Sequence, residues 1–161
     1  MSTAVLSIGS NVGDRLAHLQ LAVDALRPWL RAVSPVYETA PWGPVPQGDY
    51  LNAVLVVEDA TAGPSDWLSR AHGAERAAGR DRAREVRWGP RPLDVDVVAV
   101  DDIVSDDPLL TLPHPQAAQR SFVLVPWLAV DPGATLRGRP VRDLVARIDD
   151  GVRRRPDLEV R

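Results

Sequence analysis

The clearest strand in this sequence reads Tyr50-Leu51-Asn52-Ala53-Val54-Leu55-Val56-Val57-Glu58. Side chains on a strand alternate between the two faces of its sheet. Tyr50 and Asn52 therefore share one face with two valines, while aliphatic side chains fill the other face. This pattern predicts a central strand of a sheet.

Strands and helices are expected on both sides of this segment. Runs of β-favouring residues predict strands at residues 4–9, 32–38 and 93–100, and a proline in the second run indicates an edge or a bulge. Apolar residues at helical spacing predict amphipathic helices at residues 16–30 and 64–74. The order strand-helix-strand-strand-helix-strand is the split βαβ arrangement of ferredoxin-like α+β domains. We therefore expect a mainly antiparallel sheet with helices packed on it.

The remaining segments are less regular. Residues 39–49 and 79–92 are predicted loops, because prolines and glycines interrupt the first and charged residues fill the second. An apolar stretch covers residues 122–130, and a short helix is expected at residues 141–148.

Composition limits the class of protein. With 161 residues, of which 45% are hydrophobic, we expect one domain at residues 1–150 and a frayed tail at residues 151–161. The net charge of −3 gives no bulk electrostatic case for binding nucleic acid. The absence of cysteine excludes disulfide bonds, thiolate catalysis and Cys-bound zinc. No apolar run approaches the ~18 residues that a membrane span needs, so we expect a cytoplasmic protein with no membrane partner. We also expect a monomer.

All 19 cationic residues are arginine. A GC-rich coding bias explains that count, so only the positions of the arginines bear on function. Five of them lie in one loop: Arg80, Arg82, Arg84, Arg87 and Arg91. Such a loop fits either a salt-bridged surface or a polyphosphate site, since guanidinium groups bind phosphate in a bidentate manner. Neither a P-loop nor a Rossmann glycine motif occurs in the sequence.

Two aspartates follow this loop. Asp94 and Asp96 are two residues apart at the start of a predicted strand, so both carboxylates leave the same face, while Leu93, Val95 and Val97 face the hydrophobic layer. Adjacent anions repel each other unless a cation joins them, and oxygen ligands suit magnesium. Taken alone, the pair also fits a strand end with solvated acids. The neighbouring arginines favour a site for magnesium and polyphosphate.

The central strand offers a second kind of site. The ring of Tyr50 can stack on a flat heterocycle, and the carboxamide of Asn52 can donate and accept hydrogen bonds along its edge. The alternative is a strand-start aromatic and an amide beside a turn.

The chain resembles the 6-hydroxymethyl-7,8-dihydropterin pyrophosphokinase family, because residues 87–98 match its signature R-W-G-P-R-x-L-D-x-D followed by two hydrophobic residues. Further pieces of the family pattern follow in the right order between residues 4 and 145: Gly9-Ser10-Asn11, Tyr37-Glu38-Thr39-Ala40-Pro41, Tyr50-Leu51-Asn52-Ala53, Glu75 with Gly79-Arg80, Leu112-Pro113-His114-Pro115, and Arg120 with Phe122.

This resemblance implies a ferredoxin-like α/β/α core, with helices on both faces of the sheet, and an ATP-dependent reaction. The β,γ-diphosphate of ATP would pass to the hydroxymethyl group of the pterin with release of AMP. Two Mg²⁺ ions would be bound by Asp94 and Asp96, and Arg80 and Arg91 would be the catalytic arginines. The positions expected to bind ATP are Glu75, Arg82, Trp88, Val97, Leu110, Thr111, His114 and Arg120. The positions expected to bind the pterin are Thr39, Ala40, Pro41, Trp42, Tyr50, Asn52 and Phe122.

Some positions depart from the family pattern. The arginine loop is one residue longer than usual, so Arg84 is an alternative to Arg82 as a phosphate contact. His72 stands where glutamine is common, and Trp42 stands where a smaller aliphatic residue is common.

Two rival functions are open at this point. An RNA-binding module is the first, since ferredoxin-like sheets bind RNA through exposed aromatics. Here the central strands are mostly aliphatic and the arginines lie in a loop. A nucleotide-binding relative without activity is the second, and the retention of both aspartates argues against it.

Overall fold

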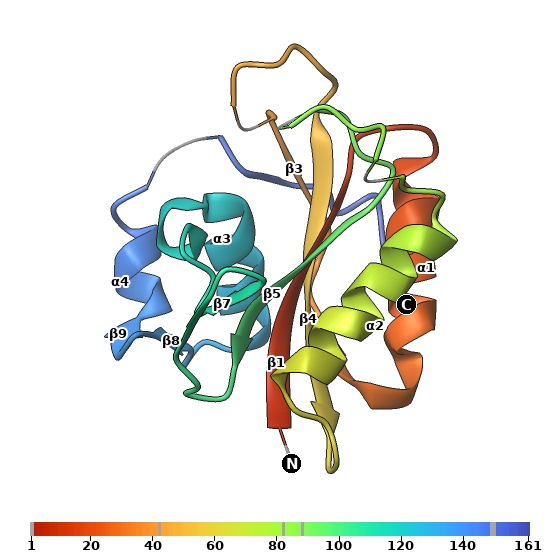
Figure 1. Ribbon diagram of the computed structural model, residues 1–161. Coiled ribbons are helices and arrows are strands. Elements are labelled where there is room, and N and C mark those ends of the chain that lie inside the picture. Colours follow the sequence, from red (N-terminus) through yellow and green to blue (C-terminus); the bar gives the residue numbers. More distant parts are fainter. Residues whose placement is uncertain (1, 42, 82, 88, 149–150) are drawn as a thin grey trace.

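The computed structural model describes residues 2–41, 43–81, 83–87, 89–148 and 151–161. Its helices and strands are, in chain order (Figure 1), β1 (Ser2–Ser10), α1 (Arg15–Leu26), the 3-10 turn η1 (Arg27–Trp29), β2 (Leu30–Val33), β3 (Tyr37–Thr39), β4 (Tyr50–Asp59), α2 (Pro64–Ala77), β5 (Asp94–Val100), β6 (Ser105–Asp107), β7 (Leu110–Leu112), the 3-10 turn η2 (Ala117–Gln119), α3 (Ser121–Val130), β8 (Thr135–Leu136), β9 (Arg139–Pro140), α4 (Val141–Val145) and β10 (Arg153–Arg154).

A six-stranded sheet forms the centre of the molecule. Its strands lie in the order β10-β3-β4-β1-β5, with β2 also paired to β4, and every pair is antiparallel. The predicted central strand, β4, pairs with the whole length of β1, from Ser2 opposite Asp59 to Ser10 opposite Leu51. This arrangement confirms the predicted ferredoxin-like, antiparallel sheet.

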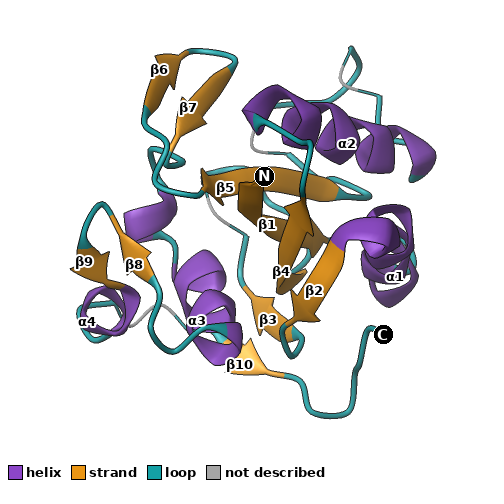
Figure 2. Cartoon of the chain, turned by 90° about the horizontal axis from the view of Figure 1, so that it is seen from below, coloured by secondary structure: helices purple, strands orange, loops and turns teal. Residues whose placement is uncertain are grey.

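Helices cover both faces of this sheet, as Figure 2 shows from below. On one face, α1 and α2 bury a core that includes Leu6, Leu55 and Trp67. On the other face, α3 and α4 pack over a smaller core around Val54 and Val98. The structure therefore has the expected α/β/α layers.

Pro35 divides the predicted strand at residues 32–38 into β2 and β3, both of which pair with β4. At this break, Ser34 continues the hydrogen bonding to β4. The Ser34 N–H donates to the Val54 carbonyl (2.9 Å), and the Ser34 hydroxyl oxygen accepts from the Val54 N–H (2.8 Å). The predicted bulge thus leaves the backbone N–H and carbonyl of Val54 satisfied.

The prediction of a frayed tail was wrong. Residues Arg153 and Arg154 form β10 and pair with β3. Farther along, Val160 is 4% exposed and belongs to the same core as α1 and α2. The polar, arginine-rich sequence of the tail hid this docking, because its partners lie more than a hundred residues earlier in the chain.

Other parts of the C-terminal half are more regular than expected. The apolar stretch at residues 122–130 forms α3, and the predicted helix at residues 141–148 is shorter, ending at Val145 as α4. Two small hairpins, β6–β7 and β8–β9, were not predicted. Within the part of the chain that the structure describes, no helix combines the length and the apolar character needed to cross a membrane.

Candidate active site

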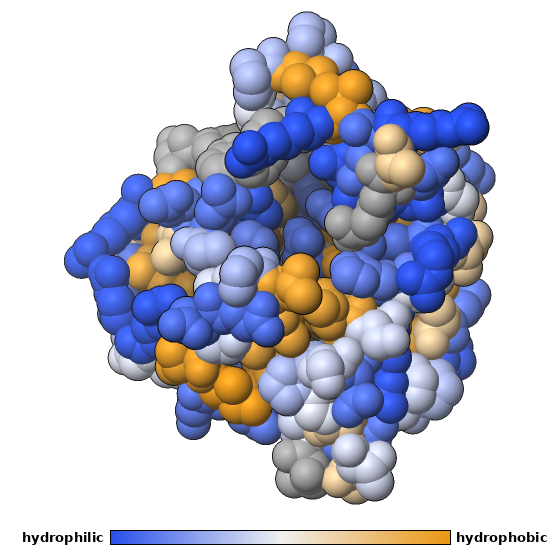
Figure 3. Space-filling model, viewed as in Figure 1, coloured by the Kyte–Doolittle hydropathy of each residue, from blue (hydrophilic) through white to orange (hydrophobic). Residues whose placement is uncertain are grey.

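A cleft of about 300 Å³ lies against the ends of β1, β4 and β5. Figure 3 shows the surface hollowed here, with hydrophilic residues inside the hollow. Eleven of the predicted site residues line the cleft: Thr39, Ala40, Tyr50, Asn52, Arg80, Arg91, Asp94, Asp96, His114, Arg120 and Phe122. Four further lining residues were not predicted: Ser7, Gly9, Gly89 and Gln116.

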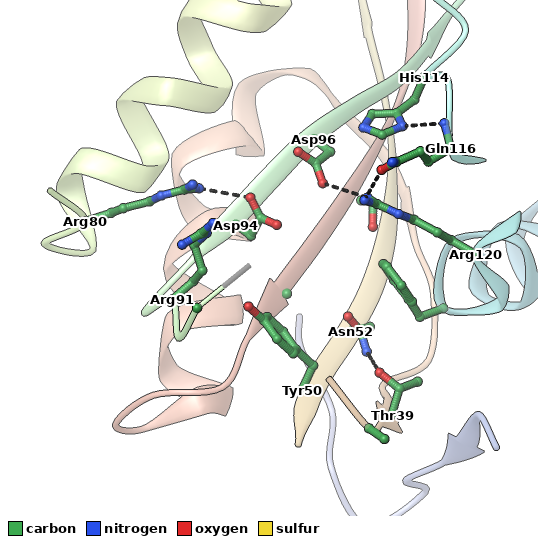
Figure 4. Close-up of a pocket in the computed structure, with 15 residues that line it drawn as sticks. Thr39, Tyr50, Asn52, Arg80, Arg91, Asp94, Asp96, His114, Gln116 and Arg120 are labelled. Atoms are coloured by element: carbon green, nitrogen blue, oxygen red, sulfur yellow. Dashed lines mark hydrogen bonds and ion pairs between the residues drawn. The ribbon is translucent and has the colours of Figure 1, made fainter. Parts of the chain in front are cut away.

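Asp94 and Asp96 leave the same face of β5, and both carboxylates point into the cleft (Figure 4). Their neighbours across the sheet are Gly9 and Ser7 of β1, which leave room above the strands. Desolvation in the cleft and the charge of the adjacent Asp94 carboxylate raise the pKa of Asp96 above its ordinary value. A divalent cation would relieve this repulsion, and hard oxygen donors that can be completed by phosphate oxygens fit magnesium.

Arg80 lies on one side of the aspartates and is held by three carboxylates. Its Nη1 donates to Asp94 Oδ1 (2.9 Å) and to Glu75, and its Nε and Nη2 donate to the two oxygens of Glu85 (2.8 Å each). Burial by itself would lower the pKa of Arg80, but the hydrogen bonds to Glu85 and the charges of Asp94 and Glu75 raise it above its ordinary value. The guanidinium is therefore a fixed positive charge at the cleft.

Arg91 approaches from the same side, at the end of the arginine loop (Figure 4). Its backbone is fixed by Asn11, because the Arg91 N–H donates to Asn11 Oδ1 (2.8 Å) and the Asn11 N–H donates to the Arg91 carbonyl (3.2 Å). The Asn11 amide also donates to Gln47 Oε1 (2.7 Å) and to the Gly48 carbonyl (3.1 Å). Asn11 thus joins three loops around the mouth of the cleft.

Arg120 lies on the opposite side of the aspartates, where its Nη1 is 3.8 Å from Asp96 Oδ2. It also donates to the side chain of Gln116, and its guanidinium carbon lies 5.4 Å from the centre of the Phe122 ring. Burial lowers the pKa of Arg120, while the charges of Asp96 and Asp94 oppose that effect. Positive charge therefore flanks the aspartates on both sides.

His114 stands beside Arg120 (Figure 4). Burial and the Arg120 charge lower the pKa of His114 to about 4, so the ring is neutral at pH 7. Its Nδ1 accepts a hydrogen bond from the Gln116 N–H (3.2 Å). In a neutral ring the proton must then be on Nε2, which makes this nitrogen a donor.

The other end of the cleft carries aromatic and amide groups. The amide nitrogen of Asn52 donates to the hydroxyl of Thr39 (2.8 Å), which fixes the orientation of the carboxamide. Burial, followed by the Asp94 charge, raises the pKa of Tyr50 to about 12, so its hydroxyl stays protonated. Gly9 packs against both residues. A Cβ atom at Gly9 would lie 3.0 Å from Asn52 Oδ1 and 3.2 Å from Tyr50 Cδ1.

The structure does not bring five of the predicted residues to the cleft wall: Pro41, Glu75, Val97, Leu110 and Thr111. Glu75 is 1% exposed and accepts from Arg80 and from the Val95 N–H (2.9 Å), so it supports the site from beneath. Val97 packs in the core under α1 and α2, because strand alternation directs it away from Asp96. Trp42, Arg82 and Trp88 lie outside the described residues.

The lining residues that were not predicted lie next to predicted ones, in the sheet or along the chain. Register places Ser7 opposite Asp96 on β1, and sequence alone does not give a register. Gly9 is the last residue of the predicted strand at residues 4–9, and a glycine at the end of a buried strand is a usable signal of a close approach. Gln116 carried no such signal.

Comparison with known proteins places this architecture in one family. The model of the family described as 7,8-dihydro-6-hydroxymethylpterin-pyrophosphokinase (HPPK) matches residues 5–132. A protein of Mycobacterium tuberculosis (strain ATCC 25618 / H37Rv), named 2-amino-4-hydroxy-6-hydroxymethyldihydropteridine pyrophosphokinase, is 50% identical, over 92% of this chain and 85% of its own length. A protein of the same name from Methylorubrum extorquens is 40% identical, over 92% of this chain and 95% of its own length.

A solved structure shares the fold at much lower identity. The crystal structure of Plasmodium falciparum HPPK-DHPS wild type superposes with a TM-score of 0.68 at 13% identity. The match covers 91% of this chain and 44% of the Plasmodium chain, so this chain spans less than half of that longer protein. The match of the family model and the two sequence relatives lead to the same conclusion: this chain belongs to the 7,8-dihydro-6-hydroxymethylpterin-pyrophosphokinase family.

Proposed function

We propose that this chain transfers the β,γ-diphosphate of ATP to the hydroxymethyl oxygen of 6-hydroxymethyl-7,8-dihydropterin and releases AMP. As a member of its family, the chain is a hydroxymethyldihydropterin pyrophosphokinase, an enzyme of folate biosynthesis. The observation that carries the detailed proposal is the division of one cleft into two ends. Paired aspartates flanked by arginines lie at one end, and Tyr50 with Asn52 lies at the other.

The charged end suits a triphosphate. Arg80 and Arg91 approach the aspartates from one side and Arg120 from the other. Guanidinium groups placed in advance around a polyphosphate can stabilise charge as it moves from the transferred group to the departing AMP. In this proposal, Arg80 and Arg91 stabilise the transferring diphosphate, and Arg120 with the Nε2–H of His114 contacts the nucleotide.

Asp94 and Asp96 are the residues that would hold magnesium, as two ions with ATP. When bound, these ions would neutralise part of the triphosphate charge and polarise the acceptor hydroxyl. The two carboxylates contribute by their placement. Both project from one rigid strand, and the facing residues of β1, Ser7 and Gly9, have small side chains or none.

The aromatic end suits the pterin. Tyr50 on β4 and Phe122 on α3 both line the cleft, so a flat ring can lie between elements on different layers of the fold. Asn52, held by Thr39, can then bond the ring edge with an acceptor and a donor. The substrate would reach its reacting position by stacking and edge recognition, with its hydroxymethyl group toward the aspartates.

The direct test is incubation with ATP, magnesium and 6-hydroxymethyl-7,8-dihydropterin, followed by measurement of AMP. Stoichiometric AMP and pterin diphosphate are expected, and ADP is not. Nucleotide binding without AMP release would instead support an inactive relative, and retention of RNA at low salt without turnover would support an RNA-binding module. A cytoplasmic, monomeric enzyme stays a prediction from the sequence.

A further inference from the structure

Glu85, a residue that no part of the sequence analysis singled out, lies between the two arginines expected to bind phosphate. Its Oε2 and Oε1 accept from Nε and Nη2 of Arg80, each at 2.8 Å. The same Oε2 lies 3.6 Å from Nη1 of Arg91. One carboxylate therefore neutralises charge on both guanidinium groups at the cleft.

The donors of Arg80 are already engaged with protein carboxylates. Its Nε and Nη2 donate to Glu85, and its Nη1 donates to Glu75 and to Asp94. Each of the three guanidinium nitrogens thus has an anionic partner within the chain. An incoming phosphate can accept from Arg80 in a bidentate manner only where one of these carboxylates gives way.

Glu85 is the carboxylate that can give way. Glu75 is 1% exposed and also accepts from the backbone of β5, so its removal would disturb the sheet. Asp94 lies on β5 and is a proposed magnesium ligand, so its carboxylate stays in the site when the nucleotide enters. Glu85 instead belongs to the loop that follows α2, and its side chain is 18% exposed. It can leave without disturbing a strand or a helix.

We propose that Glu85 is an internal counter-ion that competes with the phosphates of the nucleotide for Arg80 and Arg91 and thereby sets nucleotide affinity. The carboxylate takes the position of a phosphate group while the cleft is empty and yields it when a polyphosphate enters. This inference rests on the proposed function, because that function supplies the polyphosphate.

The decisive variant is Glu85→Gln, which keeps the shape of the side chain and removes its charge. Binding of magnesium and an ATP analogue with a methylene group between the α- and β-phosphorus atoms is measured by calorimetry. Affinity should increase about fivefold, the scale of a partly exposed ion pair. The affinity for inorganic tripolyphosphate should increase by a similar factor, while the affinity for adenosine should stay unchanged.

Glu159→Gln is the matched control, because it is the same substitution outside the arginine loop. The Glu159 side chain is 66% exposed and pairs with the exposed Arg161. This variant removes the same charge without touching an arginine expected to contact phosphate, so it should leave the affinity for the analogue within about twofold, since exposed pairs contribute little. The effect of the change in net charge is thereby controlled.

Thermal unfolding without ligand supplies a second readout. Glu85→Gln should lower the Tm of the unliganded protein and enlarge the shift that the analogue produces, because only the empty cleft loses its counter-ion. Weaker binding by Glu85→Gln, or binding equal to that of the wild type, would overturn the inference. Wild-type protein that fails to bind the analogue would overturn the proposed function and this inference together.

Discussion

Glu38 and Arg155 form an ion pair of 3.0 Å although 117 positions separate them in the sequence. Arg153 donates to the same carboxylate oxygen (3.0 Å), and Arg15 donates to the other (2.6 Å). The hydrogen bond from Arg15, assisted by Arg155 and Arg153, lowers the pKa of Glu38. Because Glu38 directly precedes Thr39 in β3, the C-terminal tail fixes a residue of the cleft from outside it.

Deletion of residues 151–161 tests this connection. The free energy of unfolding should fall by about 2–4 kcal/mol, because Val160 and the partly buried Leu158 leave the core. The KM for the pterin should rise more than the KM for ATP, since Thr39 loses its support. Urea unfolding and steady-state kinetics measure the two effects.

Two variants of the full chain separate the ion pair from the buried apolar residues. Arg155→Ala should raise the KM for the pterin with a smaller loss of stability than the deletion. Arg161→Ala is the control, because its side chain is 83% exposed and pairs with Glu159. A deletion variant with unchanged stability and unchanged pterin kinetics would show that the tail contributes nothing to the site.

Asp96→Asn should reduce AMP formation by at least about a hundredfold, comparable to the loss of one preorganised charge-stabilising group. The amide keeps the volume of the side chain but removes a metal-binding charge. The unliganded protein should stay folded, since repulsion from Asp94 disappears. AMP release and circular dichroism are the measurements, with Asp102→Asn in the exposed turn after β5 as the control. Near wild-type turnover in magnesium would refute the metal assignment.

Tyr50→Ala should weaken pterin binding by about tenfold to a hundredfold, since stacking on an aromatic side chain is worth roughly 1–3 kcal/mol. Binding of ATP should change little, because the nucleotide is assigned to the other end of the cleft. Tyr50→Phe keeps the ring and should keep most of the affinity. Calorimetry with each ligand provides the comparison, and equal losses for both ligands in Tyr50→Ala would contradict the stacking role.

Much of this cleft could be predicted from local sequence patterns. The period of two along β5 places Asp94 and Asp96 together and sends Val95 to the core, as the structure has it. The same alternation separates Tyr50 and Asn52 from Leu51, Ala53 and Leu55, which belong to the core under α1 and α2. These predictions need only the location of a strand and the alternation of its side chains, and a few residues are enough to indicate both.

Features that depend on distant partners could not be predicted. The tail was predicted to be frayed because the fold, and not the local sequence, brings its arginines to Glu38. The two bonds from Arg80 to Glu85 depend on the path of a loop, which composition does not determine. Val97 shows where the two kinds of prediction differ. The family pattern implies a position at ATP, while strand alternation directs its side chain to the core, as the structure has it.

The titration of His114 predicts how stability depends on pH. Its folded pKa of about 4 lies below the ordinary value of 6.5. Between these pH values the unfolded chain binds a proton that the folded chain does not, so the free energy of unfolding falls as pH falls from 6.5 toward 4. The loss from this residue is at most about 3 kcal/mol. Urea unfolding at several pH values, without nucleotide or metal, measures it.

His114→Gln removes this titration and should flatten the pH dependence of stability below pH 6.5. Parallel curves for the wild type and His114→Gln would mean that the histidine is not held neutral in the folded protein.

Gly9→Ala tests whether the close packing of β1 against Tyr50 and Asn52 shapes the pterin end of the cleft. The new Cβ would lie 3.0 Å from Asn52 Oδ1 and 3.2 Å from Tyr50 Cδ1, so both side chains must shift by a few tenths of an ångström. Because the stacking and edge groups would move together, pterin affinity should fall about tenfold, within the range expected for lost stacking. Gly73→Ala in α2 is the matched control. It adds the same methyl group with no contact closer than 3.8 Å, and it should raise stability by up to about 1 kcal/mol without changing pterin affinity. Unchanged pterin binding in Gly9→Ala would mean that this end of the cleft has more room than the packing of Gly9 implies.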